Sequence, residues 1–117
     1  MSNLEKNLLE PIPIVRALFL LLIKKYPNST GYDLMSYVSE FTHGKIKLQT
    51  GTVYGELRRL EKSKLLVSKL TTEGRKKRCY EITDAGKEEL ACLIRAIRFR
   101  IDNLLEPLIK LYDEIFE

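Results

Sequence analysis

Apolar side chains recur at helical spacing from the first prolines onward. A first segment begins near Pro11 and Pro13, which suit the start of a helix and not its interior, and continues to Tyr26. Apolar side chains cover most of its circumference, so we expect a buried helix with several packing partners.

A second helix is predicted to begin at Ser29 or Thr30, either of which is a good N-cap residue. Asp33 then falls in the first turn, where a carboxylate interacts favourably with the helix dipole. A predicted inward stripe follows at helical spacing: Leu34, Met35, Val38 and Phe41.

A third helix is predicted from about Thr50, and the spacing of Val53, Leu57 and Leu60 defines its buried face. At 100° per residue, the opposite face holds two glycines and two cations, with Tyr54 at its edge. These residues are Gly51, Gly55, Arg58 and Lys62. The small residues permit close approach to another surface, and the cations favour a negatively charged one.

Residues 65–71 and 76–82 are rich in β-compatible side chains and flank the glycine-containing turn 72–75. This pattern predicts a β-hairpin, with Tyr80 and Ile82 directed inward.

Thr83 and Asp84 predict the cap of a long final helix. Apolar residues in this helix alternate at spacings of four and three, which is typical of a dimer-forming heptad seam. The seam consists of Leu90, Ile94, Ile97, Ile101, Leu104, Leu108, Leu111 and Ile115. Pro107 is expected to kink the helix or divide it after Leu105. The seam alternatively packs on the first helix of its own chain.

The net charge of +4 over 117 residues is modest, but its distribution is uneven. Residues 45–78 contain eleven basic and three acidic side chains, whereas residues 79–117 contain five basic and nine acidic ones. This asymmetry is typical of a protein that binds an anionic polymer.

Other classes of function find little support in the composition. Cys79, Cys92 and His43 are too few for a four-ligand zinc site, and no disulfide framework is indicated, so we expect a reduced, cytoplasmic protein. The apolar run 17–23 is too short to cross a membrane. With no nucleotide-binding or nucleophile motif either, we expect neither a cofactor nor an enzyme.

The order helix, helix, helix, hairpin, helix is that of a winged helix-turn-helix, in which the third helix enters the major groove and the hairpin, or wing, contacts the DNA backbone. The expected fold class is therefore mainly α with a small β-hairpin (α+β). We expect residues 11–83 to form the DNA-binding domain and residues 84–117 the dimerisation helix, packed as one structural unit.

Four motifs in register make this resemblance specific. Residues 30–34 (TGYDL), 50–54 (TGTVY), 57–61 (LRRLE) followed by 65–67 (LLV), and 75–86 (RKKRCYEITDAG) resemble the PadR-like transcriptional regulators. The resemblance covers roughly residues 14–90 and implies a dimeric DNA-binding regulator, most often a repressor. The single C-terminal helix resembles the smaller branch of that family. Gly55 departs from the proline that the family often has there, and the chain has no Trp of the kind with which some members stack flat drugs.

The candidate DNA-binding residues lie on the third helix and the wing. They are Thr50, Thr52, Tyr54, Arg58, Arg59, Lys62, Arg75, Lys76, Lys77 and Arg78. The cations alternatively form ordinary solvated surfaces, Thr50 and Thr52 alternatively cap the helix, and Tyr54 alternatively edges the core. We favour DNA, because consecutive cations repel one another without an anion and phosphate is their natural partner.

The sequence therefore predicts a regulator that binds a roughly palindromic operator in double-stranded DNA as a homodimer, and the resemblance implies that it acts as a repressor. The alternative is a protein-interaction adaptor that uses the same fold without nucleic acid. The sequence identifies no effector; by the resemblance, a small molecule would bind between the first and last helices at the dimer interface.

Overall fold

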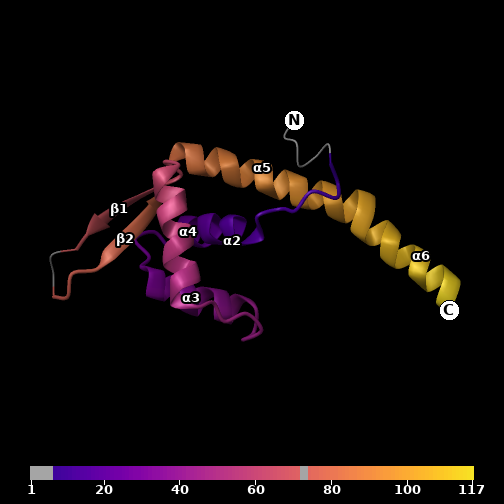
Figure 1. Ribbon diagram of the computed structural model, residues 1–117, viewed down its shortest axis with the longest axis horizontal. Coiled ribbons are helices and arrows are strands. Elements are labelled where there is room, and N and C mark those ends of the chain that lie inside the picture. The colour runs from indigo at the N-terminus through magenta and orange to yellow at the C-terminus, as the bar shows by residue number, and fades with distance from the viewer. Residues whose placement is uncertain (1–6, 72–73) are drawn as a thin grey trace. The chain divides into compact units, whose positions relative to one another are not determined.

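The computed structural model describes residues 7–71 and 74–117, so the predicted turn residues Thr72 and Glu73 lie outside the described part. Six helical segments and two strands follow one another in the predicted order (Figure 1). They are α2 (Ile14–Lys25), α3 (Gly31–Phe41), α4 (Thr50–Lys62), β1 (Leu66–Leu70), β2 (Arg78–Ile82), α5 (Asp84–Arg100), the π-helical segment η1 (Ile101–Leu105) and α6 (Glu106–Phe116).

The chain forms two compact units. The larger is Ile14–Leu90, and the smaller joins Ala91–Glu117 to the N-terminal segment that ends at Pro13. The division falls inside α5, while the functional division that the sequence suggests, at residue 84, stays a prediction.

The core of the larger unit is built from the predicted helix faces. Phe19, Leu20 and Ile23 of α2 are almost completely buried, as are the inward residues of α3 and α4. Those residues are Leu34, Val38, Val53, Leu57 and Leu60. Full burial of such a side chain contributes roughly 1.5–3 kcal/mol, so this cluster is the main stabilising element of the unit.

The start of α3 follows the predicted capping chemistry. The Thr30 hydroxyl accepts from the Asp33 backbone N–H at 3.1 Å, and the Asp33 carboxylate accepts from the Thr30 N–H at 2.9 Å. This reciprocal capping box satisfies two backbone donors that the helix itself leaves free.

The predicted inward stripe of α3 is wrong at its end. Phe41 is 64% exposed and Met35 is only half-buried. Phe41 is the last residue of α3, and Thr42 ends the helix with its hydroxyl bonded to the Val38 carbonyl oxygen at 2.9 Å. The pattern predicts Phe41 in the core, but the helix ends at this residue and its side chain stays exposed.

The hairpin is antiparallel and in the register Leu66 with Ile82 through Leu70 with Arg78. Tyr80 is buried as predicted, and Ile82 is half-buried. A further bridge pairs Ser29 with Tyr80, through Tyr80 N–H to the Ser29 oxygen at 2.9 Å and Asn28 N–H to the Tyr80 oxygen at 3.1 Å. The residues just before α3 thus line up along the outer edge of β2.

Candidate nucleic-acid interface

The predicted division of α4 into two faces is confirmed. Val53, Leu57 and Leu60 are fully buried, whereas Arg58 and Lys62 are exposed on the far side. Gly51 is also exposed, and a side chain built there would touch nothing within 4 Å. Any surface that approaches α4 from this side therefore meets backbone and cations first.

The sequence allowed Thr50 and Thr52 to cap the third helix instead of contacting DNA, and the structure has a different cap. The N-cap residue is Gln49, whose side chain makes no capping hydrogen bond, and Thr50 and Thr52 are exposed residues of the first turn. Thr50 is therefore not the cap. Because no side chain caps this end, its backbone N–H groups are free to meet an anion, which helix N-termini favour.

The position of Tyr54 depends on a glycine in another helix. A Cβ atom built on Gly31 would lie 2.6 Å from Cζ and 2.8 Å from the hydroxyl oxygen of Tyr54. The tyrosine ring therefore occupies the space that a side chain at residue 31 would need. This contact places the Tyr54 hydroxyl beside the first turn of α3.

The cations of the hairpin are exposed, and they differ in their partners. Lys69 is 3.9 Å from the Glu81 carboxylate, and Arg78 donates to the Ser68 hydroxyl at 2.8 Å. Ser68 in turn donates to Glu61 of α4. In the described residues, Arg75, Lys76 and Lys77 make no ion pair with a carboxylate.

The pKa of Tyr80 reflects the charged side chains that surround it where the hairpin meets α4. Burial raises the pKa of its phenol, the Glu61 carboxylate raises it further, and the guanidinium groups of Arg78 and Arg58 oppose the rise. Charged side chains of α4 and β2 therefore act on the same buried hydroxyl, which stays protonated at neutral pH.

A hollow of about 500 Å³ opens where α3, α4 and the hairpin meet. It is lined by Thr30, Tyr32, Asp33, Tyr54, Arg75, Lys76, Lys77 and Arg78. Five of the ten predicted DNA-binding residues thus share one site, which we call the basic hollow. Thr50, Thr52, Arg58, Arg59 and Lys62 lie along α4 outside its lining.

Arg59 differs from Arg58 in that its charge already has a partner. It donates to Glu56 through Nε at 3.1 Å and Nη2 at 3.0 Å. Glu56 also faces Arg16 of α2 at 3.5 Å, and Arg16 faces Glu89 of α5 at 3.4 Å. This chain of ion pairs joins three helices, so Arg59 is part of a structural network.

Two residues that lie beside predicted DNA-binding positions were missed from the sequence. Tyr32 lines the basic hollow and is 71% exposed, and Gln49 stands uncapped at the start of α4. An exposed aromatic residue in the first turn of a helix was the available signal for Tyr32. Its neighbours came from the hairpin, more than forty residues away in sequence, which no local pattern shows.

Comparison with known proteins identifies this arrangement. The sequence model of the transcriptional regulator PadR-like family matches residues 19–92, which hold α3, α4 and the hairpin. The chain belongs to the PadR-like family.

Solved PadR-family structures have the same fold. Bacillus subtilis PadR in complex with operator DNA is 28% identical, with a TM-score of 0.64 over 73% of this chain and 48% of that chain. A PadR-like regulator from Bacillus cereus is 28% identical, with a TM-score of 0.64 over 79% and 91%. A PadR-family regulator from Clostridium difficile, at 24% identity, shares the fold with a TM-score of 0.70 over 81% and 97%. The chain spans about half the length of the Bacillus subtilis protein, and no curated protein matches it.

The C-terminal helices of this PadR-like chain are continuous, and they turn π-helical just before Pro107, where the proline was expected to kink or divide them. The segment η1 is π-helical, its Glu106 N–H bonds to the Ile101 oxygen, and α6 begins at Glu106 with Pro107 in its first turn. The Asn103 side-chain amide also donates to the Phe99 oxygen at 2.9 Å. Because a π-turn rotates less per residue than an α-turn, the heptad seam does not continue as one straight stripe.

The seam residues differ in exposure along the helices. Leu90, Ile94, Ile97 and Leu104 are half-buried. Ile101, Leu108, Leu111 and Ile115 are exposed, and α6 contains no buried residue. Within α5 the buried apolar side chains are those of Leu93 and Ala96, which lie outside the seam.

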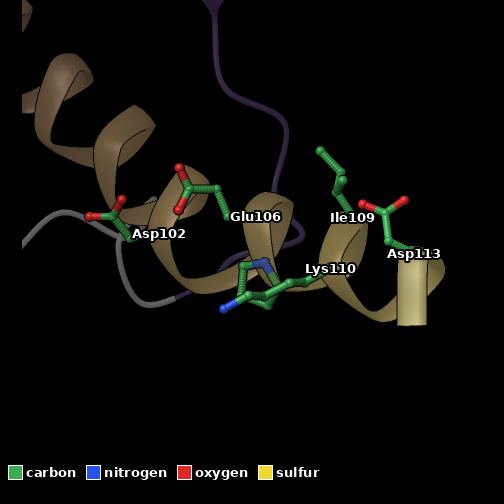
Figure 2. A pocket seen from close by; sticks show the side chains of 6 residues that line it. Asp102, Glu106, Ile109, Lys110 and Asp113 are labelled. Atoms are coloured by element: carbon green, nitrogen blue, oxygen red, sulfur yellow. The ribbon is translucent and has the colours of Figure 1, made fainter. Parts of the chain in front are cut away.

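A second hollow, of about 590 Å³, lies along η1 and α6, with Pro107 and Ile109 among its lining residues (Figure 2). Asp102, Glu106 and Asp113 contribute three carboxylates, and Lys110 points away from those of Glu106 and Asp113 in Figure 2. Its excess of negative charge disfavours DNA. Among residues 7–71 and 74–117, no group of three or more His, Cys, Asp or Glu side chains is arranged to hold a metal ion. In the same ranges no helix has the length and apolar character needed to cross a bilayer.

Proposed function

We propose that this PadR-like regulator is a sequence-specific repressor that binds a roughly palindromic operator as a homodimer. The observation that carries the proposal is the basic hollow, which gathers four consecutive cations and Tyr54 beside the exposed strip of α4. Duplex DNA presents phosphates on both sides of its major groove, so a helix inserted there brings the adjoining cations to the backbone.

Each candidate residue has a role in this proposal. Arg58 and Lys62 lie on the face of α4 opposite the core and are the candidates for base edges or nearby phosphates. The candidates for phosphates are Thr50, Thr52, Tyr54, Arg75, Lys76, Lys77 and Arg78. Arg59 reaches a phosphate only by leaving Glu56.

The exposed apolar face of α6 supports a homodimer. Leu108, Leu111 and Ile115 are 56–64% exposed, and Tyr112 and Phe116 stack on each other beside them. A soluble protein rarely leaves so many large apolar side chains uncovered on one helix. A second copy covers them and places two α4 helices on half-sites about one helical turn apart.

Operator binding is supported by the Bacillus subtilis relative, whose structure contains operator DNA, and the repressor role follows from what such binding excludes. A dimer seated on an operator competes for the same DNA with any other protein that must bind there. In a reporter assay with the operator beside a promoter, the protein is expected to lower expression; raised expression would contradict this part of the proposal.

DNA selected from a random pool tests the proposal in a mobility-shift titration. The double variant Arg58→Ala, Lys62→Ala is expected to lose specific binding while it keeps the helical circular dichroism of the parent. Lys24→Ala, Lys25→Ala removes the same charge from the exposed end of α2 and should bind like the parent.

The salt dependence provides an independent measure. If each subunit neutralises about four phosphates, the logarithm of the affinity should fall with the logarithm of the salt concentration at a slope of about −7 for the dimer. A protein-interaction adaptor would show weak DNA binding with little salt dependence, and that result would overturn the proposal.

A further inference from the structure

The basic hollow is built from parts of the chain whose spacing is fixed. The backbone bridge between Ser29 and Tyr80 ties the residues before α3 to β2. Tyr54 of α4 lies against Gly31 in the first turn of α3. The backbones of α3, α4 and β2 are therefore held beside one another, which gathers exposed donor side chains from all three parts of the chain around one hollow.

The charge balance of the hollow calls for an anion. Arg75, Lys76 and Lys77 pair with no carboxylate in the part of the chain that the structure describes. The one carboxylate in the lining, that of Asp33, accepts the Thr30 N–H as part of the α3 capping box. The positive charges outnumber it four to one.

Tyr32 adds to this site a hydroxyl group that has no hydrogen-bond partner among the described residues. It belongs to the first turn of α3, is 71% exposed, and lines the hollow together with Tyr54 and the hairpin cations. The described residues show no hydrogen bond to its hydroxyl, whereas Thr30 and Asp33 beside it are both engaged in the cap. A phenol beside unpaired cations is a suitable donor to a phosphate oxygen.

We propose that the basic hollow holds one phosphodiester of the DNA backbone in each half-site, and that Tyr32 donates a hydrogen bond to it from α3 while the hairpin cations neutralise it from the other side. The inference rests on the proposed DNA-binding function and adds a contact from a second helix. Because a phosphate contact carries no base information, Tyr32 fixes how the chain is seated on the duplex and not which bases it reads.

The experiment combines Tyr32→Phe with DNA that carries a single neutral methylphosphonate. The full-length variant is expected to bind unmodified operator about tenfold more weakly per half-site, because it loses one hydrogen bond to a charged group. The parent should lose affinity when one particular phosphate in each half-site is neutralised. At that position Tyr32→Phe should lose little further affinity, and at other contacted phosphates it should lose as much as the parent.

Tyr26→Phe is the matched control, since Tyr26 is 37% exposed just after α2, stacks on Tyr37 and does not line the hollow, and the substitution again removes only a hydroxyl. Affinity of Tyr32→Phe equal to that of the parent, or equal additional losses at every phosphate, would overturn the inference while leaving specific DNA binding intact. If the parent itself selects no DNA, the proposed function fails, and the inference fails with it.

Free phosphate is the other source of the same chemistry. Saturable binding of inorganic phosphate by the parent, lost in Tyr32→Phe while the affinity for DNA stays unchanged, would assign the hollow to a small anion and overturn the inference. Competition by phosphate no stronger than that of chloride at equal ionic strength supports the DNA backbone as the ligand.

Discussion

The ring of Tyr54 fills the space over Gly31, where a Cβ atom would approach its Cζ to 2.6 Å. The contact joins the first turn of α3 to α4, and it involves a tyrosine that lines the basic hollow. Gly31 has an ordinary helical backbone conformation. A glycine is required at this position because the side chain of Tyr54, from another helix, fills the space.

Gly31→Ala is therefore expected to weaken DNA binding without unfolding the protein. The methyl group would displace the tip of the Tyr54 side chain, which can move, whereas alanine is well tolerated in a helix. We expect roughly a tenfold loss of affinity for the operator, as when one contact to a charged phosphate is removed. Fluorescence anisotropy measures the affinity, and circular dichroism checks the fold.

The same substitution in a Tyr54→Ala background is the control. With no ring to displace, Gly31→Ala should change the affinity little beyond the loss caused by Tyr54→Ala. If the two losses add in full, the steric explanation is wrong.

Gly86 makes a tighter contact, and its partner cannot move. A Cβ atom at this position would lie 2.2 Å from the Leu65 carbonyl oxygen and 2.7 Å from Cγ1 of Ile82. Since backbone must shift to admit it, Gly86→Ala should lower the free energy of unfolding by roughly 3 kcal/mol. Gly51→Ala, in open space on α4, should instead raise it by up to about 1 kcal/mol. Urea denaturation of both variants measures the difference, and similar stabilities would contradict the assignment.

Periodicity in the sequence was sufficient for the helix faces because burial depends on spacing within one element. Val53, Leu57 and Leu60 are at the predicted positions for this reason. Pro107 marked the π-helical turns before α6, because a proline has no N–H to donate and its ring crowds the preceding turn. Phe41 shows where periodicity fails. The apolar pattern continues to this last residue of α3, whereas Val38 is the last residue of the helix that is buried in the core.

The assembly of the candidate site depends on contacts between distant residues, which no local pattern reveals. Tyr32 is a candidate because it lines a hollow together with hairpin residues, and the Ser29–Tyr80 bridge brings that hairpin beside α3. In the same way, Arg59 was a candidate as a cation of the third helix, although it lies to the side of the face that holds Arg58 and Lys62. Its partner Glu56 is three residues earlier, but Glu56 is held in place by Arg16 from α2.

Glu56→Gln tests that network through stability. The Glu56 side chain is only 12% exposed, and the Nε atom of Arg16 is buried without a hydrogen bond, so loss of the carboxylate leaves Arg16 with Glu89 alone among its described partners. We expect the free energy of unfolding to fall by about 1–2 kcal/mol. Glu81→Gln removes an exposed pair with Lys69 and should cost less than about 0.5 kcal/mol. Equal losses in thermal denaturation would show that the three-helix network adds nothing.

The apolar face of α6 gives a prediction for the oligomeric state. Leu108 and Leu111 are 59% and 56% exposed, and α6 buries no residue, so replacing both leucines by serine leaves the packing of the chain intact. The double variant Leu108→Ser, Leu111→Ser is expected to elute as a folded monomer in light-scattering chromatography, at concentrations where the parent is a dimer, because about 1.5–3 kcal/mol is lost for each leucine that the partner no longer buries. It should also lose cooperative operator binding, since one subunit contacts only one half-site.

Lys110→Ser is the control, since it changes a charged residue of the same helix that lines the acidic hollow along η1 and α6, and it should leave the dimer unchanged. A dimeric double variant, or a monomeric parent, would show that α6 is not the interface.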